Sequence, residues 1–186
     1  KVLRLELAQD AGTADRMRVE AQALAALSHP NIVNVTDLSR TADGRPFYVM
    51  ERLEGCTLGE DFRRRRQYSV EEAIDVTRQI LAGLEAAHQL GLVHRDIKMD
   101  NVFLQRATTG ERVVKLLDFG VAKVLADRSA RAPAPPSLPT ADGAVVGTPR
   151  YLSPEQVLGR GVDHRADIYA TGLVLYAFFD TSVAGA

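Results

Sequence analysis

The chain is poor in cysteine and in long apolar runs, and each shortage excludes a class of protein. Cys56 is the only cysteine among 186 residues, which rules out an internal disulfide framework and fits a reducing compartment. The longest late apolar run, residues 173–179, is too short to span a bilayer, and the first residues lack the pattern of a signal peptide. We therefore expect a cytoplasmic chain without a membrane segment, any tether lying outside these residues.

Net charge is also nearly absent. Lys and Arg number 23 against 24 Asp and Glu, a formal net charge of -1, so no global field recruits nucleic acid or an anionic membrane. The local exception is the run of four arginines at residues 63–66, which has no interleaved aromatic side chains. We interpret the run as a solvated surface and expect no nucleic-acid partner.

The most informative stretch is HRDIKMDN at residues 94–101, followed after one apolar run by Asp118 in DFG. Asp96, a lysine two residues later (Lys98) and an asparagine five residues later (Asn101) can converge on one metal-bound phosphate. Asn101 and Asp118 offer the hard oxygen ligands that Mg²⁺ prefers. The spacing predicts a site for phosphoryl transfer.

The first third of the chain predicts a small sheet with one helix. Residues 2–7 alternate like a strand, and Thr13 can cap a helix in which Glu20 lies beside an apolar stripe. Residues 32–35 and 46–50 have the composition of two strands joined by a turn.

After Gly55 the pattern becomes helical. Ser69 with Glu72 forms a capping box, and Gly91 marks the end of the helix. The apolar face of this helix is expected to contain Ile74, Ile80, Leu81, Leu84 and Ala87. Residues 102–104 and 113–117 predict a hairpin that leaves Asn101 and Asp118 at strand ends facing one cleft. The expected fold class is α+β in two lobes.

The order of these motifs resembles that of eukaryotic-like protein kinases, and the residues within them resemble those of bacterial Ser/Thr kinases. A lone DFG occurs by chance, but the motifs occur here in one order. They are Lys1 before VL, Glu20, HPNIV at 29–33, HRDIKMDN, DFG, Gly147-Thr148, SPE at 153–155, DIY at 167–169 and Gly172. The resemblance implies a partial small lobe through the hinge at residues 1–53, containing a sheet and one helix. A partial, mainly helical large lobe with the catalytic loop and activation segment would span 54–186.

The resemblance assigns catalytic roles. Asp96 would orient the substrate hydroxyl and accept its proton, and Lys98 would neutralise charge on the transferring phosphate. Asn101 and Asp118 would hold Mg²⁺. His94, like Phe119, is expected to be a packing residue.

The resemblance also places ATP. Lys1 would grip the α- and β-phosphates with Glu20 as its ion-pair partner, although a lysine at a chain end is more usually only solvated. Met50 would be the gatekeeper, and the backbone of Glu51 and Leu53 would hydrogen-bond the adenine.

In the family that the chain resembles, residues like Lys98 and Gly147-Thr148 go with Ser/Thr kinases, so the resemblance implies protein Ser/Thr hydroxyls as acceptors. A small-molecule phosphotransferase of kinase-like fold would lack the SPE segment and the long loop before it. Within that loop, a phosphate on Ser129, Ser137 or Thr140 could dock on Arg95 through self-phosphorylation; the alternative is an unregulated linker. These three positions lie in a proline-rich run.

Two departures from the family pattern support an alternative. No Gly-rich loop precedes Lys1, and the helices that should surround residues 167–179 are missing from the sequence. A catalytically inactive kinase remnant, or a non-catalytic binding module, therefore stays open beside the active enzyme. We expect residues 1–186 alone to be poorly soluble and to turn over little ATP.

Overall fold

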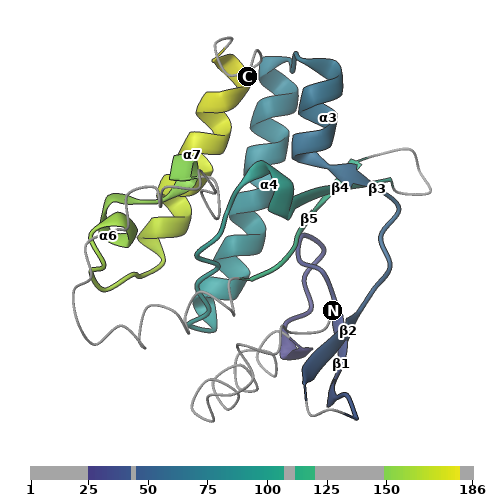
Figure 1. Ribbon diagram of the computed structural model, residues 1–186. Coiled ribbons are helices and arrows are strands. Elements are labelled where there is room, and N and C mark those ends of the chain that lie inside the picture. The colour runs from purple at the N-terminus through teal and green to yellow at the C-terminus, as the bar shows by residue number, and fades with distance from the viewer. Residues whose placement is uncertain (1–24, 43–44, 107–111, 120–148, 181–186) are drawn as a thin grey trace, which may run out of the picture.

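The structure is a computed structural model that describes residues 25–42, 45–106, 112–119 and 149–180. A two-stranded antiparallel sheet, β1 (Val35–Arg40) and β2 (Pro46–Met50), lies to one side of a larger helical body (Figure 1). The body contains α3 (Leu58–Arg65), α4 (Val70–Gln89) and α7 (Arg165–Phe179), with β3 (Gly55–Thr57), β4 (Val102–Arg106) and β5 (Arg112–Leu116). Shorter turns of helix are η1 (Met99–Asn101), η2 (Pro149–Tyr151) and α6 (Pro154–Val157). This α+β arrangement is the predicted fold class.

The predicted hairpin is confirmed, and it gains an edge strand that the sequence pattern does not indicate. β4 pairs antiparallel with β5, and β3 adds to the other side of β4. Gly55 has φ +150°, and a Cβ there would lie 2.0 Å from the carbonyl oxygen of Leu104. Only glycine allows the chain to pass so close to β4.

One strand prediction is wrong in its boundary. Ile32 and Val33 are not part of the first strand, because Ile32 forms a parallel bridge with Leu116 of β5. Leu116 donates its N–H to the carbonyl of Asn31 at 2.8 Å and accepts the N–H of Val33 at 3.1 Å. The buried Ile32 thereby attaches the small sheet to the helical body, and β1 begins at Val35.

Helix α4 begins as predicted, with the Ser69–Glu72 capping box, and Gly91 adopts φ +73° just after its end. The predicted apolar face is partly wrong, because Ile74 and Leu81 are exposed. The residues of α4 that are buried are Ala73, Val76, Ile80, Gly83, Leu84 and Ala87. Gly83 explains the rotation: a Cβ there would meet the Asn31 carbonyl and Leu116, both at 3.0 Å, so this face can approach β5 closely.

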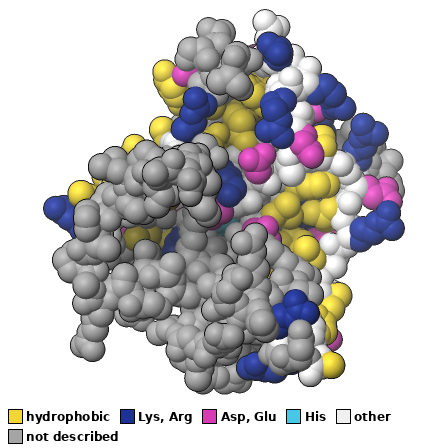
Figure 2. Space-filling view, viewed as in Figure 1, with side chains coloured by type: hydrophobic (Ala, Val, Ile, Leu, Met, Phe, Trp, Pro, Cys, Tyr) yellow, Lys and Arg dark blue, Asp and Glu magenta, His cyan; other side chains and the backbone are white. Residues whose placement is uncertain are grey.

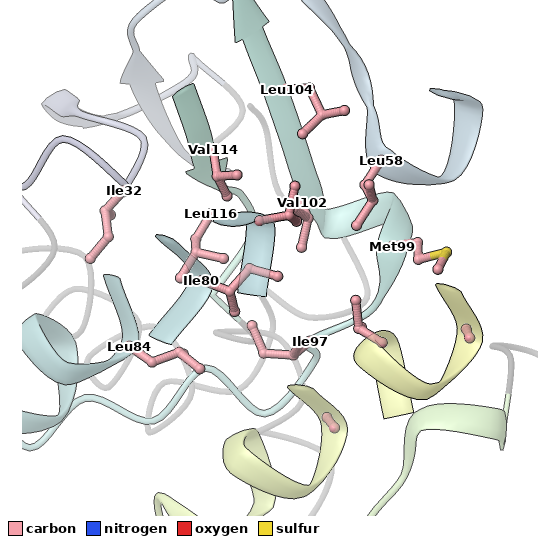
Figure 3. Close-up of a cluster of buried hydrophobic side chains, with 14 of the residues drawn as sticks. Ile32, Leu58, Ile80, Leu84, Ile97, Met99, Val102, Leu104, Val114 and Leu116 are labelled. Atoms are coloured by element: carbon pink, nitrogen blue, oxygen red, sulfur yellow. The ribbon is translucent and has the colours of Figure 1, made fainter. Parts of the chain in front are cut away.

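The core joins α4, the sheet and the loop of residues 94–101 into one cluster. Figure 3 shows Ile80 and Leu84 of α4 beside Leu116 of β5, with Ile97 of the 94–101 loop next to them. Burying side chains of this size typically stabilises a fold by about 1.5–3 kcal/mol each. The loop is therefore part of the core as well as of the site.

Candidate active site

Two of the predicted site residues, Lys98 and Asn101, meet at the carboxylate of a third, Asp96. Lys98 Nζ lies 3.0 Å from Asp96 Oδ2, and Asn101 Nδ2 donates to the same oxygen at 2.9 Å. Asn101 also donates to the backbone carbonyl of Asp96 at 2.8 Å, because the turn η1 brings the asparagine back over the loop. A positive charge and an amide thus hold a partly exposed carboxylate in one orientation.

Asp167 of helix α7 supports this loop through hydrogen bonds to its backbone. Its buried carboxylate accepts the backbone N–H of His94 at 2.8 Å and of Arg95 at 2.7 Å. His88 Nε2 on α4 lies 2.8 Å from the same carboxylate. The sequence indicates Asp167 only as part of the DIY motif. The signal that could have pointed to its supporting role is an aspartate within an otherwise apolar helix.

His94 attaches the loop to the segment that follows β5. The side chain is fully buried, its Nε2 lies 2.7 Å from the Leu117 carbonyl, and its Nδ1 accepts the backbone N–H of Asp96 at 3.3 Å. These partners assign the neutral tautomer with the proton on Nε2, and burial lowers the pKa of His94. The ring packs on Phe119, with centroids 4.5 Å apart, which confirms the predicted packing role of both residues.

Asp118 follows β5 with φ +50°, an uncommon conformation for a residue other than glycine. The backbone N–H of Leu117 donates to the Asn101 carbonyl at 2.9 Å, so the DFG segment is attached to the loop of residues 94–101. The hydroxyl of Tyr48 on β2 donates to Asp118 Oδ1 at 3.3 Å, a contact that the sequence spacing does not indicate. Burial, together with the charge of Asp118, raises the pKa of Tyr48.

The donor set fits magnesium. Asn101 uses its Nδ2 for both bonds to Asp96, which turns the amide oxygen away from that carboxylate. That oxygen and the Asp118 carboxylate would be the two protein ligands. Across the described ranges no group of three or more His, Cys, Asp or Glu side chains could hold a metal. Mg²⁺ commonly takes one or two protein ligands and completes its shell with water and phosphate, so two oxygen donors suffice.

Met50 ends β2, and Glu51 and Leu53 follow it as a connecting segment. The N–H of Glu51 donates to the carbonyl of Asn34 at 2.9 Å, which attaches the start of that segment to the residue just before β1. Other predicted positions lie outside the described residues: Lys1, Glu20, Ser129, Ser137, Thr140 and Gly147-Thr148.

The run of arginines at residues 63–66 was predicted to be a solvated surface, and the structure confirms this only in part. Arg63 and Arg64 are exposed, but Arg65 is mostly covered and forms a 2.7 Å ion pair with Glu72. Arg64 also pairs with the buried Asp61. Burial by itself raises the pKa of Asp61, but hydrogen bonds from Tyr68 and Arg64 outweigh it and hold that pKa below its usual value. On the face in Figure 2, basic and acidic side chains are interspersed.

No helix in the described ranges is long and apolar enough to cross a membrane.

Comparisons with known proteins identify the family of the chain. The family model described as the protein kinase domain matches residues 1–183. The serine/threonine-protein kinase PksC of Streptomyces coelicolor is 44% identical over 183 residues, covering 95% of this chain and 31% of that protein. The serine/threonine-protein kinase pkn3 of Myxococcus xanthus is 39% identical over 176 residues, with the same two shares. The chain thus spans about a third of the length of these relatives.

Solved structures agree as well. The crystal structure of the Mycobacterium tuberculosis PknI kinase domain matches with a TM-score of 0.72 and 28% identity, covering 97% of this chain and 62% of that chain. Members of the family generally use ATP and Mg²⁺. The chain belongs to the protein kinase domain family.

Proposed function

We propose that the protein is a serine/threonine protein kinase that transfers the γ-phosphate of ATP to protein hydroxyls in the cytoplasm. The observation that carries the proposal is the Asp96 carboxylate, held by Lys98 and Asn101 beside the strand end that carries Asp118. The names of the bacterial relatives support the same activity.

Asp96 orients the acceptor hydroxyl and takes its proton as the oxygen bonds to the γ-phosphorus. The bond from that phosphorus to the bridging oxygen breaks, and ADP leaves with the electron pair. Lys98 neutralises charge on the transferring group, since its ammonium already lies 3.0 Å from Asp96. Asn101 and Asp118 would hold Mg²⁺, and the bound metal would supply charge neutralisation at the phosphates.

The nucleotide site in this proposal uses Met50 as gatekeeper and the backbone of Glu51 and Leu53 for the adenine. Lys1, paired with Glu20, grips the α- and β-phosphates. The first fifty-three residues then act as the small lobe and residues 54–186 as the large lobe.

Two alternatives are less well supported. An inactive remnant or binding module has no need of a carboxylate held by two donors, yet Asp96 has both. A small-molecule phosphotransferase lacks an SPE segment, whereas here Ser153 caps α6 and Gln156 of that helix donates to the Arg95 carbonyl at 2.9 Å.

Regulation by self-phosphorylation at Ser129, Ser137 or Thr140 belongs to the same proposal. Arg95 offers a docking group, because its Nε is buried and has no hydrogen-bond partner in the part of the chain that the structure describes. A buried donor without a partner is costly, and a phosphate would satisfy it. Replacing the three residues with alanine should lower activity that depends on autophosphorylation; unchanged turnover would disprove this regulation.

Asp96→Asn tests the activity, with Asp100→Asn in the same loop as the matched control. Asp100 is exposed and paired only loosely, 3.7 Å from Arg63. In the natural-length protein with Mg²⁺, ATP and a Ser/Thr-containing protein substrate, Asp96→Asn should lower kcat by about 10²–10⁴-fold, as loss of a general base does. Asp100→Asn should keep near-normal kcat, and phosphoamino-acid analysis should find phosphoserine or phosphothreonine. Full turnover by Asp96→Asn would refute the assignment.

A further inference from the structure

Glu51 and Lys115 form an ion pair between two segments that the proposed function uses separately. Glu51 is the first residue after β2, in the segment proposed to contact adenine, and Lys115 lies on β5 three residues before Asp118. Lys115 Nζ is 2.7 Å from Glu51 Oε1. The two side chains are only 12% and 27% exposed, so solvent screens the pair less than it screens a surface pair.

Backbone groups complete the surroundings of both charges. Glu51 Oε1 also accepts the N–H of Asn34 at 2.8 Å, while the N–H of Glu51 donates back to the Asn34 carbonyl at 2.9 Å. Lys115 Nζ makes a longer contact, 3.4 Å, with the carbonyl of Ile32. Ile32 itself bridges to Leu116, the next residue of β5. The pair therefore closes a ring of contacts through the residues just before β1, the connecting segment after β2, and β5.

The charges favour a pair that stays ionised. Burial alone raises the pKa of Glu51, but the hydrogen bonds from Lys115 and Asn34 and the charge of Lys115 hold it below its usual value. A charge-assisted bond at 2.7 Å with a second donor on the same oxygen restricts the carboxylate to one orientation. The Glu51 side chain thereby fixes the backbone that carries it.

We propose that the Glu51–Lys115 pair is a positioning clamp that pre-forms the nucleotide-binding backbone by holding residues 50–53 against β5. This inference rests on the proposed function. Adenine recognition through backbone groups needs that backbone held in place before binding, because ordering it afterwards would subtract from affinity. Neither side chain contacts the reacting atoms; Glu51 and Lys115 act through the segment between β2 and β3.

The test is nucleotide binding to the natural-length protein carrying Lys115→Met, which keeps the stem and removes the charge. Calorimetric titration with ADP should show Kd raised about fivefold, the effect of one net hydrogen bond. The increase should be the same with and without Mg²⁺, because the clamp acts on the adenine end, and kcat at saturating ATP should stay within about twofold while KM for ATP rises. Lys115→Arg, which keeps the charge, should restore most of the affinity.

Two further variants separate the clamp from a purely structural ion pair. Arg78→Met breaks the exposed Arg78–Asp75 pair on α4, where the arginine side chain is 73% exposed, and should leave Kd unchanged. Glu51→Gln combined with Lys115→Met should weaken binding no more than the stronger single change, because both remove the same contact. If Lys115→Met does not fold, Glu51→Gln alone must raise Kd.

The outcomes are distinct. A lowered Tm with unchanged Kd for ADP, or additive effects in the double variant, would overturn the clamp and leave a structural pair. Failure of the unmodified protein to bind ADP at all would overturn the proposed function itself.

Discussion

The backbone N–H of Arg95 donates to the carboxylate of Asp167 at 2.7 Å, across 72 residues of sequence. Arg95 adopts φ +62°, a left-handed conformation that costs a residue with a side chain roughly 1–2 kcal/mol. A hydrogen bond to a charged acceptor contributes a comparable amount, about 1.5–3 kcal/mol. The hydrogen bond to the Asp167 carboxylate on α7 therefore offsets the backbone strain at Arg95, the residue that precedes Asp96 in the loop.

Asp167→Asn should disturb the loop without removing any proposed catalytic group. The asparagine amide has only one oxygen, so its NH₂ group would face one of the two backbone N–H groups that now donate hydrogen bonds to Asp167. We expect a loss of about 1–3 kcal/mol in the free energy of unfolding, measured by denaturant titration, together with a lower kcat. Asp163→Asn, which affects an exposed pair with Arg165 near the start of the same helix, is the control. Normal kcat in Asp167→Asn would show that the loop holds its shape without this support.

Stability should depend on pH through His94. Its pKa in the folded protein is lowered by burial from the ordinary value of 6.5, so the unfolded chain binds a proton first as the pH falls. The stabilisation is therefore fully present above about pH 6.5 and declines below it, by at most about 1.4 kcal/mol per pH unit for one proton. His94→Gln should be less stable at pH 7.5 but should lose less stability than the unmodified protein between pH 7.5 and 5.5. Equal losses in the two proteins would contradict a neutral, buried His94.

Tyr48→Phe removes only the hydroxyl that donates to Asp118 Oδ1. The ring, which packs against the core, remains. We expect the Mg²⁺ concentration needed for half-maximal ADP binding to rise about two- to fivefold, because one modest hydrogen bond no longer restrains the carboxylate. Binding of ADP without Mg²⁺ should not change, and a loss there would indicate a general packing defect instead.

Residues 1–186 produced alone should associate. Helix α7 exposes Tyr176 and Phe179, and a groove of about 470 Å³ between α4 and α7 is lined by Ile74, Leu81 and Leu175. Exposed apolar surface of this kind promotes self-association. Analytical ultracentrifugation should find oligomers, and Tyr176→Lys with Phe179→Lys should shift them toward monomer. A monodisperse monomer with Mg²⁺-ATP-dependent phosphorylation abolished by Asp96→Asn would contradict the expectation.

Local patterns in the sequence are sufficient for several elements. The Ser69–Glu72 capping box, the end of α4 before Gly91 and the β4–β5 hairpin each depend on residues close together in the chain, and all three form as expected. The grouping of Asp96, Lys98 and Asn101 is local too, because five residues and one turn of η1 bring them together.

The tertiary structure alone decides the contacts that hold these local pieces in place. Asp167 contacts the loop of residues 94–101, Glu51 contacts Lys115 across 64 residues, and Tyr48 contacts Asp118 across 70. No spacing rule predicts such pairs, because each depends on how two separately formed elements pack. The same holds for α4, where Ile74 and Leu81 fit the helical period but lie exposed, since the close approach at Gly83 selects which side faces β5. The sequence by itself determines the residue types of the site and the local turns, because both depend on short-range geometry. Which polar groups hold those residues in position is determined by long-range packing.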